Sequence, residues 1–286
     1  MIRVRACCFA LYAAAGAPCL WARAQVRPGL DLTVANRYVW RGLMRKNGVV
    51  AQPDVYLAVP LSTGWLAAGT WADVELQPAG NSDLTDVGHR RVGVGEVDYW
   101  VSASGAMGVV DASVGWVAYR YHLDASPAGR DRTWNTSELY SSVRVRSAGW
   151  SPKLSVWWDV TRVRGGYVEA SVTAPLLANP TGRPFWTVYV GALAGYNISQ
   201  GPNANRPSEL ANFAGKGLTH IDLSLAVYFR PPVVRLPSRS TQLVGHLQVN
   251  RDDATRRHSL GVSASREPLT LWVAVVFSLP AYGREN

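Results

Sequence analysis

Charged side chains recur at every second position in several segments of this chain. Glu96 and Asp98 are separated by Val97, and Arg144 and Arg146 are separated by a single residue. Successive side chains of a β-strand point to opposite faces, so each pair places two charges on one face. Carboxylates and guanidinium groups enclosed together can form ion pairs, or they can line a passage and select ions. The charged residues predicted to face inward are Arg37, Arg41, Asp54, Asp73, Glu75, Glu96, Asp98, Asp111, Glu138, Arg144, Arg146, Asp159, Glu169 and Asp222.

Two uses for these charges stay open on the sequence alone. They can form a polar network that fills the interior, or they can line a path for solutes and set its ion preference. Arg41 illustrates the choice, because a planar guanidinium with several donors can bridge carboxylates on neighbouring strands. We expect Arg41 to point inward with Arg37 and favour a structural role for it over contact with a solute. Gly42 is expected to let the chain turn outward after it.

Long strands are the elements that must position these charges. Between residues 219 and 229, large apolar residues such as Ile221 and Leu223 alternate with polar or small ones. This rhythm gives each strand one apolar face and one polar face. By the same alternation, Trp40, Trp116 and other aromatic residues are expected on the outward, apolar face. Twelve strands are expected, near residues 31–42, 50–59, 65–76, 94–106, 109–122, 134–147, 153–164, 167–174, 185–196, 219–230, 241–250 and 269–279.

The connections between these strands alternate in length. Short turns near residues 61–64, 105–108 and 148–152 are interspersed with polar stretches such as 77–93 and 197–218. Bacterial membrane barrels have short periplasmic turns, longer outer loops and even strand counts. We therefore predict an all-β fold, a transmembrane antiparallel up-and-down β-barrel of about 12 strands. A count of 14 is the alternative, the alternating run 258–265 is assigned to a loop, and a soluble sandwich or barrel stays as the competing fold.

Residues 1–24 are expected to be a removable signal peptide, which leaves residues 25–286 as the barrel. The segment starts with basic residues, continues with a mostly apolar stretch and ends on the small-x-small site Ala22-Arg23-Ala24. A mature chain that begins at Gln25 lacks cysteine, because all three lie earlier: Cys7, Cys8 and Cys19. Disulfides, thiolate metal sites and a cysteine nucleophile are then excluded. An exported chain of this kind is expected in the bacterial outer membrane.

Candidate residues for other chemistry are sparse. The five histidines are scattered, and no spacing typical of a metal site or a phosphate-binding glycine loop occurs, so no catalytic residue, metal or cofactor is predicted. The net charge of +9 includes three arginines of the leader, and the remaining bases are spread over loops. We therefore expect no nucleic-acid partner. The expected partners are outer-membrane lipid, lipopolysaccharide and small solutes, and the oligomeric state is left open.

One segment resembles a known family. Asn36-Arg37-Tyr38-Val39-Trp40-Arg41-Gly42, followed by a polar loop and Gln52-Pro53-Asp54-Val55-Tyr56, is similar to the opening of the TorF-type porin family of Gram-negative outer membranes. The likeness extends loosely over later segments, including Tyr167-Val168-Glu169-Ala170-Ser171-Val172. The chain departs from the family pattern in its long connection at 231–240 and in continuing past Phe277 to its end. The resemblance implies an outer-membrane barrel.

The function predicted from these observations is passive diffusion of small hydrophilic or ionic solutes through a porin-like barrel. Two alternatives remain: a non-conducting barrel that serves structure or adhesion, and a barrel that hydrolyses lipid at its rim. We predict that the chain is not an enzyme, because the five histidines are scattered and the side chains of the adjacent His258 and Ser259 would diverge on a strand.

Overall fold

The computed structural model describes residues 26–46, 48–77, 92–121, 135–147, 149–178, 186–202, 212–213, 215–229, 240–250 and 269–279. The predicted signal peptide, the run 258–265 and the connection 231–239 lie outside these residues. The described ranges contain no helix that is long and apolar enough to cross a membrane.

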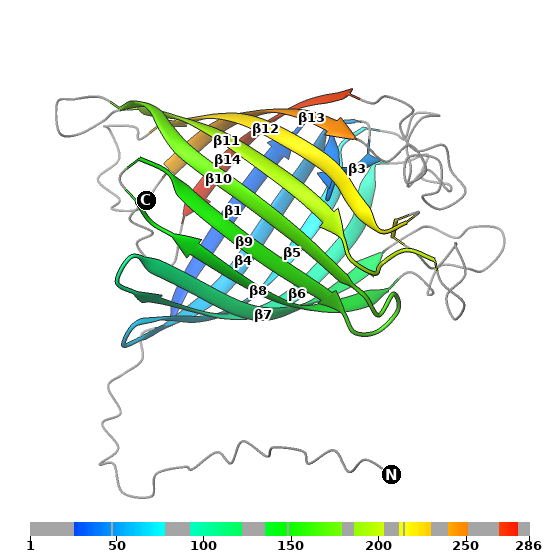
Figure 1. Cartoon of the computed structure of the whole chain (residues 1–286), viewed down its shortest axis with the longest axis horizontal. Helices are drawn as coiled ribbons and strands as arrows, with labels where there is room; N and C mark the ends of the chain where they lie inside the picture. The colour runs from blue at the N-terminus through cyan, green and yellow to red at the C-terminus, as the bar shows by residue number, and fades with distance from the viewer. Residues whose placement is uncertain are drawn as a thin grey trace, which may run out of the picture.

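Twelve antiparallel strands close into a barrel, as predicted. Each strand pairs with its neighbour along the chain, and the first strand pairs with the last, so the sheet has no free edge. Figure 1 shows the strands running obliquely around the wall. The wall strands are β1 (Arg27–Ala35), β4 (Val50–Leu61), β5 (Gly64–Glu75), β6 (Gly93–Met107), β7 (Val110–Tyr121), β8 (Thr136–Val145), β9 (Ser151–Asp159), β10 (Gly166–Ala178), β11 (Trp186–Asn197), β12 (Gly217–Phe229), β13 (Ser240–Asn250) and β14 (Leu269–Leu279).

The two faces of the wall differ as the alternation predicts. On β12, Leu223 is 50% exposed on the outside, whereas the neighbouring Asp222 is buried inside. The same contrast holds on β6, where Tyr99 is exposed and Asp98 is buried. An apolar outer face on a closed barrel suits hydrocarbon, because each wall strand is hydrogen-bonded to a neighbour on both sides and no sheet edge faces the lipid. Trp116, Trp158 and Trp186 are also exposed on this outer face, as expected.

The first predicted strand, 31–42, is wrong. The wall strand β1 begins earlier and ends at Ala35, and the chain then forms a separate two-stranded hairpin of β2 (Tyr38–Trp40) and β3 (Leu43–Lys46). We call residues 38–46 the inner hairpin, because it lies inside the barrel against inward-facing side chains of the wall. Trp40 is therefore not on the outer face. Its ring stacks on Phe213, with 6.5 Å between the centroids, and the expectation that it faces lipid is wrong.

The inner hairpin turns at the two residues Arg41 and Gly42, which have φ angles of 49° and 84°. Two-residue hairpin turns with positive φ at both positions match the twist of the strands they join. Glycine adopts this conformation readily, whereas arginine does so at a cost. A methyl group at Gly42 would also lie 2.6 Å from the His220 ring, so glycine both relaxes the turn and lets it approach β12. Gly42 turns the hairpin tip rather than sending the chain outward.

Candidate functional site

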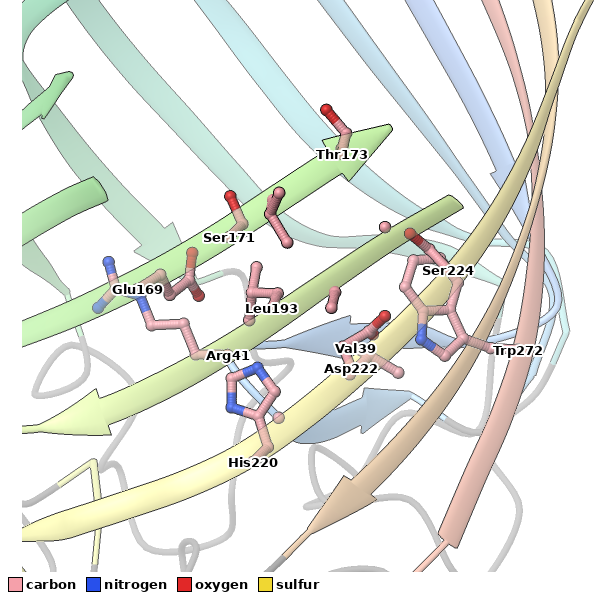
Figure 2. A pocket seen from close by; sticks show the side chains of 14 residues that line it. Val39, Arg41, Glu169, Ser171, Thr173, Leu193, His220, Asp222, Ser224 and Trp272 are labelled. Carbon is pink, nitrogen blue, oxygen red and sulfur yellow. The ribbon is translucent and has the colours of Figure 1, made fainter. Parts of the chain in front are cut away.

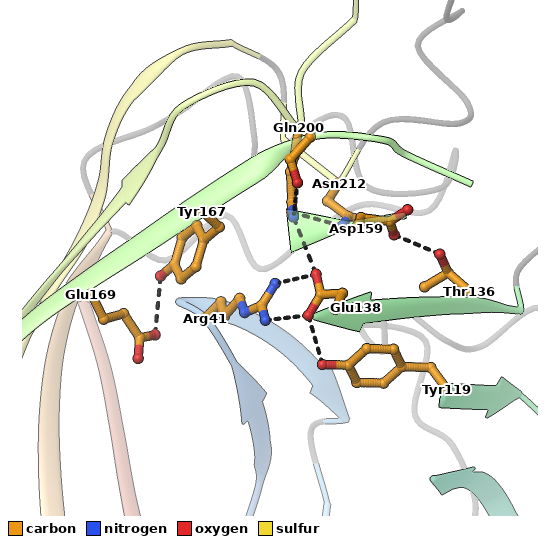
Figure 3. A network of polar contacts seen from close by, with 10 residues as sticks. Arg41, Tyr119, Thr136, Glu138, Asp159, Tyr167, Glu169, Gln200 and Asn212 are labelled. Atoms are coloured by element: carbon orange, nitrogen blue, oxygen red, sulfur yellow. Dashed lines mark hydrogen bonds and ion pairs between the residues drawn. The ribbon is translucent and has the colours of Figure 1, made fainter. Parts of the chain in front are cut away.

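The tip of the inner hairpin is held by a buried ion pair. Arg41 donates from both terminal nitrogens to Glu138 on β8, at 2.8 Å to Oε1 and 2.5 Å to Oε2 (Figure 3). The Arg41 side chain is 5% exposed and that of Glu138 is 1% exposed. A forked pair of this kind has the geometry in which a guanidinium binds a carboxylate most specifically. Arg41 thus crosses the interior from the hairpin to the opposite wall.

Aromatic rings surround the same guanidinium. Its central carbon lies 4.5 Å from the ring centroid of Trp40, 4.7 Å from that of Tyr167 and 4.9 Å from that of Trp157. Each ring face attracts the positive charge. Burial is the largest single effect and opposes the charge of Arg41, but the carboxylate of Glu138 and the neighbouring Tyr119 and Tyr167 together raise the pKa of Arg41 above its ordinary value. The residue therefore stays charged in its pocket.

Glu138 is satisfied by further donors besides Arg41. The hydroxyl of Tyr119 donates to Oε2 at 2.8 Å, and Nε2 of Gln200 donates to Oε1 at 3.1 Å (Figure 3). Asn212 donates in turn to Gln200, so the network reaches the connection between β11 and β12. A buried carboxylate with this many donors is stable in its charged form. Glu138 therefore holds Arg41 at the tip of the inner hairpin.

The second strand of the inner hairpin is held in a similar way. Lys46 donates to Glu75 on β5 at 2.8 Å, and both side chains are almost fully buried. From the first strand, the hydroxyl of Tyr38 donates to Glu96 on β6 at 2.9 Å. The hairpin is therefore fixed to β5 and β6 on one side and to β8 on the other.

Two cavities flank the inner hairpin, and Val39 and Trp272 line both of them. The first, which we call the Asp222 cavity, has a volume of about 310 Å³. Figure 2 shows Glu169, Asp222 and the hydroxyls of Ser171 and Ser224 among the side chains around it. The second, which we call the Asp98 cavity, has a volume of about 340 Å³. The hairpin thus divides the interior without filling it.

The predicted inward-facing charges divide into separate groups. Arg37 lies directly before the inner hairpin and Arg41 lies at its turn, so neither is on a wall strand, which corrects their predicted position. Asp111 pairs with Arg144 at 2.8 Å and with Arg146 at 3.2 Å, near the short turns and far along the strands from the inner hairpin. These three are partly exposed, in contrast to the buried acidic residues around the hairpin.

Four more of the predicted residues make specific contacts. Asp54 accepts a hydrogen bond from the indole of Trp100 at 2.9 Å, Asp73 accepts one from Gln52 at 3.1 Å, and Glu169 accepts one from Tyr167 at 3.2 Å. Asp159 is fully buried at the end of β9, where Oδ1 accepts from the backbone of Thr161, Val163 and Arg164. Asp159 therefore shapes the turn between β9 and β10. Because this turn begins at Asp159, β9 ends earlier than the predicted residue 164.

Several residues of this site were missed by sequence reasoning. Lys46, Gln200 and Asn212 hold the hairpin, yet none was singled out. A signal for the hairpin does exist, since Arg41-Gly42 sits between two short apolar runs, as a two-residue turn would. No comparable signal marks Gln200 or Asn212, because their partners are distant in sequence.

Among the five histidines, the structure describes the side chain of His220. His220 is buried on β12 and lines the Asp222 cavity, with Nδ1 3.0 Å from the hydroxyl of Thr219. His89, His122 and His258 lie outside the described residues. In the described part of the chain, no group of three or more candidate ligands could hold a metal ion.

Comparisons with known proteins show that the fold of this chain is similar to that of solved outer-membrane proteins. No protein-family model matches the chain, and no curated protein matches its sequence. The structure of LpxR from Salmonella typhimurium is similar, at 10% identity over 88% of this chain and 99% of that one, with a TM-score of 0.51. An outer membrane channel from Pseudomonas putida F1 is 8% identical over 92% and 98% of the two chains, also with a TM-score of 0.51. Outer membrane phospholipase A from Escherichia coli is 13% identical over 90% and 93%, with a TM-score of 0.42.

The closed wall and its apolar outer face define the chain as an outer-membrane β-barrel protein, whose place is the bacterial outer membrane. Within that class, identities this low indicate the fold and nothing finer. The expectation that this chain is not an enzyme stays a prediction.

Proposed function

We propose that the chain is an outer-membrane channel for passive diffusion of small hydrophilic solutes, with the inner hairpin as its constriction. The observation that carries this proposal is the pair of cavities beside the hairpin, of about 310 and 340 Å³. Since one water molecule occupies about 30 Å³ of liquid, each cavity has room for roughly ten. A hairpin that served only to fill the interior would be expected to leave less space.

The charges around the cavities favour cations. Arg41 lines the Asp222 cavity, but its charge is balanced by Glu138. Glu169 and Asp222 line the same cavity and add two further carboxylates. A passage with acidic side chains concentrates cations and excludes anions. We therefore expect small conductance steps with a preference for cations.

The resemblance to the TorF-type porin family supports the same function. The residues that carry it, Tyr38-Val39-Trp40-Arg41-Gly42, form the first strand and turn of the inner hairpin. We propose that the chain is a member of this family and that the motif specifies an inner hairpin. We also propose that outer-membrane lipid and lipopolysaccharide surround the barrel.

Conductance in planar bilayers tests the proposal. The wild-type protein should give small steps, and a salt gradient should give a reversal potential of the sign expected for cations. A matched variant, in which residues 37–48 are replaced by a short Gly-Ser linker, should give larger steps because the constriction is removed. Silent bilayers with inserted wild-type protein, together with a conducting variant, would show that the hairpin closes the barrel and would contradict the proposal. Silence of both would favour a structural barrel.

A further inference from the structure

Asp98 lies between two aromatic side chains of the wall. In the sheet register it is directly opposite Trp71 on β5 and directly opposite Tyr119 on β7. Residues directly opposite each other in antiparallel strands project from the same face, with their Cβ atoms about 5 Å apart. Trp71, Asp98 and Tyr119 all line the Asp98 cavity. A carboxylate thus stands between an indole and a phenol on the inner wall.

The inner hairpin covers this row with two more rings. The ring of Tyr38 lies 5.6 Å from that of Trp71, and the ring of Trp40 lies 6.3 Å from that of Tyr119 at an angle of 81°. Tyr38 and Trp40 also line the cavity. Two rings from the wall and two from the hairpin therefore line the cavity beside one carboxylate. Arg41 and Arg45 already lie over the ring of Trp40, so we call Tyr38, Trp71 and Tyr119 the aromatic cage.

The carboxylate of Asp98 has unused capacity to bind. The residue is 8% exposed, and among the described residues its Oδ1 atom has no hydrogen-bond partner. Leaving a buried polar atom of this kind without a partner is unfavourable. A positive charge placed among the rings would balance the negative charge of the carboxylate and would interact with the ring faces at the same time.

The nature of the lining selects the kind of cation. Small metal ions require several oxygen ligands, whereas the cavity is lined chiefly by aromatic and aliphatic side chains. A quaternary ammonium group needs no hydrogen bonds and is the cation that aromatic cages accept best. Arg37 lines the same cavity and favours a ligand that also carries a carboxylate.

We infer that the Asp98 cavity binds small zwitterions that combine a quaternary ammonium group with a carboxylate. This inference rests on the proposed function, since it names a class of solute that the passage would accept. The ammonium group lies within the cage formed by Tyr38, Trp71 and Tyr119, beside Asp98. The carboxylate of the ligand faces Arg37.

Glycine betaine and 3,3-dimethylbutyrate provide a matched pair of probes. They have the same shape and the same carboxylate, but a carbon atom in the second replaces the charged nitrogen of the first. The full chain in detergent is titrated with each probe, and binding is followed by the trimethyl proton signal of the ligand and by tryptophan fluorescence. Glycine betaine should bind at least tenfold more tightly. Equal affinities, or no binding of glycine betaine, would overturn the inference.

Two substitutions test whether binding of glycine betaine depends on Asp98 itself or only on the total charge of the protein. Asp98→Asn keeps the shape of the side chain and should weaken glycine betaine binding at least tenfold. Asp111→Asn removes a carboxylate near the short turns and should leave binding unchanged. Heat-modifiable migration on gels checks that both variants are folded. If Asp98→Asn misfolds, Trp71→Leu replaces it and should weaken binding severalfold by removing one ring of the cage. Unchanged affinity in a folded Asp98→Asn or Trp71→Leu variant would refute the site.

The proposal of a channel and the inference of a binding site can be refuted independently. Conductance without selective binding of glycine betaine would retain the channel and remove the site. Selective binding to a protein that gives no conductance would retain the site and remove the channel.

Discussion

Replacing Arg41 with alanine should release the inner hairpin while the wall stays intact. The substitution leaves Glu138 buried without its forked partner and removes the cation from among three rings. Loss of one partner of a buried ion pair typically costs about 3–5 kcal/mol. The loss falls mainly on docking of the hairpin, because the twelve wall strands are hydrogen-bonded to one another without it.

A change of this size shifts the docking equilibrium by a factor of about 10² to 4 × 10³, since every 1.4 kcal/mol is tenfold. The expected result in planar bilayers is a larger mean conductance with frequent transitions between levels. Heat-modifiable migration on gels should persist, which shows that the wall still forms. Arg41→Lys keeps the charge but not the fork and should fall between the wild type and Arg41→Ala.

A double variant tests whether the effect comes from the ion pair. Replacing both Arg41 and Glu138 by apolar residues, as in Arg41→Met with Glu138→Leu, leaves no unpaired buried charge. Apolar replacement of a buried pair is often close to neutral. The double variant should therefore be nearer to wild type than Arg41→Ala alone. Wild-type conductance in Arg41→Ala would refute the conclusion that this pair holds the hairpin.

Three further substitutions test other parts of the account. Gly42→Ala places a side chain at a φ of 84° and against the His220 ring, so it should weaken docking by about 1–3 kcal/mol and raise mean conductance. Lys46→Met leaves the buried Glu75 without its cation, so it should weaken docking of the hairpin by about 3–5 kcal/mol and raise mean conductance. Leu223→Arg places a charge on the lipid face and should cost about 2–4 kcal/mol in reversible folding into vesicles. The control Thr173→Arg, in the Asp222 cavity, should cost clearly less, and equal losses would contradict the assignment of the faces.

The wall was predictable because alternation is a property of each strand alone. On β12, the sequence places Ile221, Leu223 and Leu225 on one face, and these residues are exposed on the outside of the barrel. Eleven of the expected strands correspond to wall strands, with ends that differ by several residues in places such as β9 and β10. The ends are harder to predict, because tertiary contacts such as those of Asp159 decide them.

The inner hairpin was not predicted, because its residues also alternate. Tyr38, Trp40 and Gly42 continue the rhythm of β1, and nothing local separates a wall strand from a hairpin folded into the interior. The distinction depends on partners far along the chain, such as Glu138 for Arg41. The paired positive φ angles at Arg41 and Gly42 mark the turn, whereas the glycine alone predicts an outward bend.

The central claim is that lipid bathes the outer face of the wall while the inner face is enclosed, and a spin-label scan along β12 tests it most directly. Because the three cysteines of the sequence all precede residue 20, a chain that begins at Gln25 accepts single cysteines for labelling without interference. Labels at Ile221, Leu223 and Leu225 should be reached by oxygen dissolved in the lipid, whereas labels at Asp222 and Ser224 should be reached by a water-soluble nickel complex or by neither. Equal accessibility to the nickel complex at all five positions, in protein reconstituted in vesicles, would contradict the account.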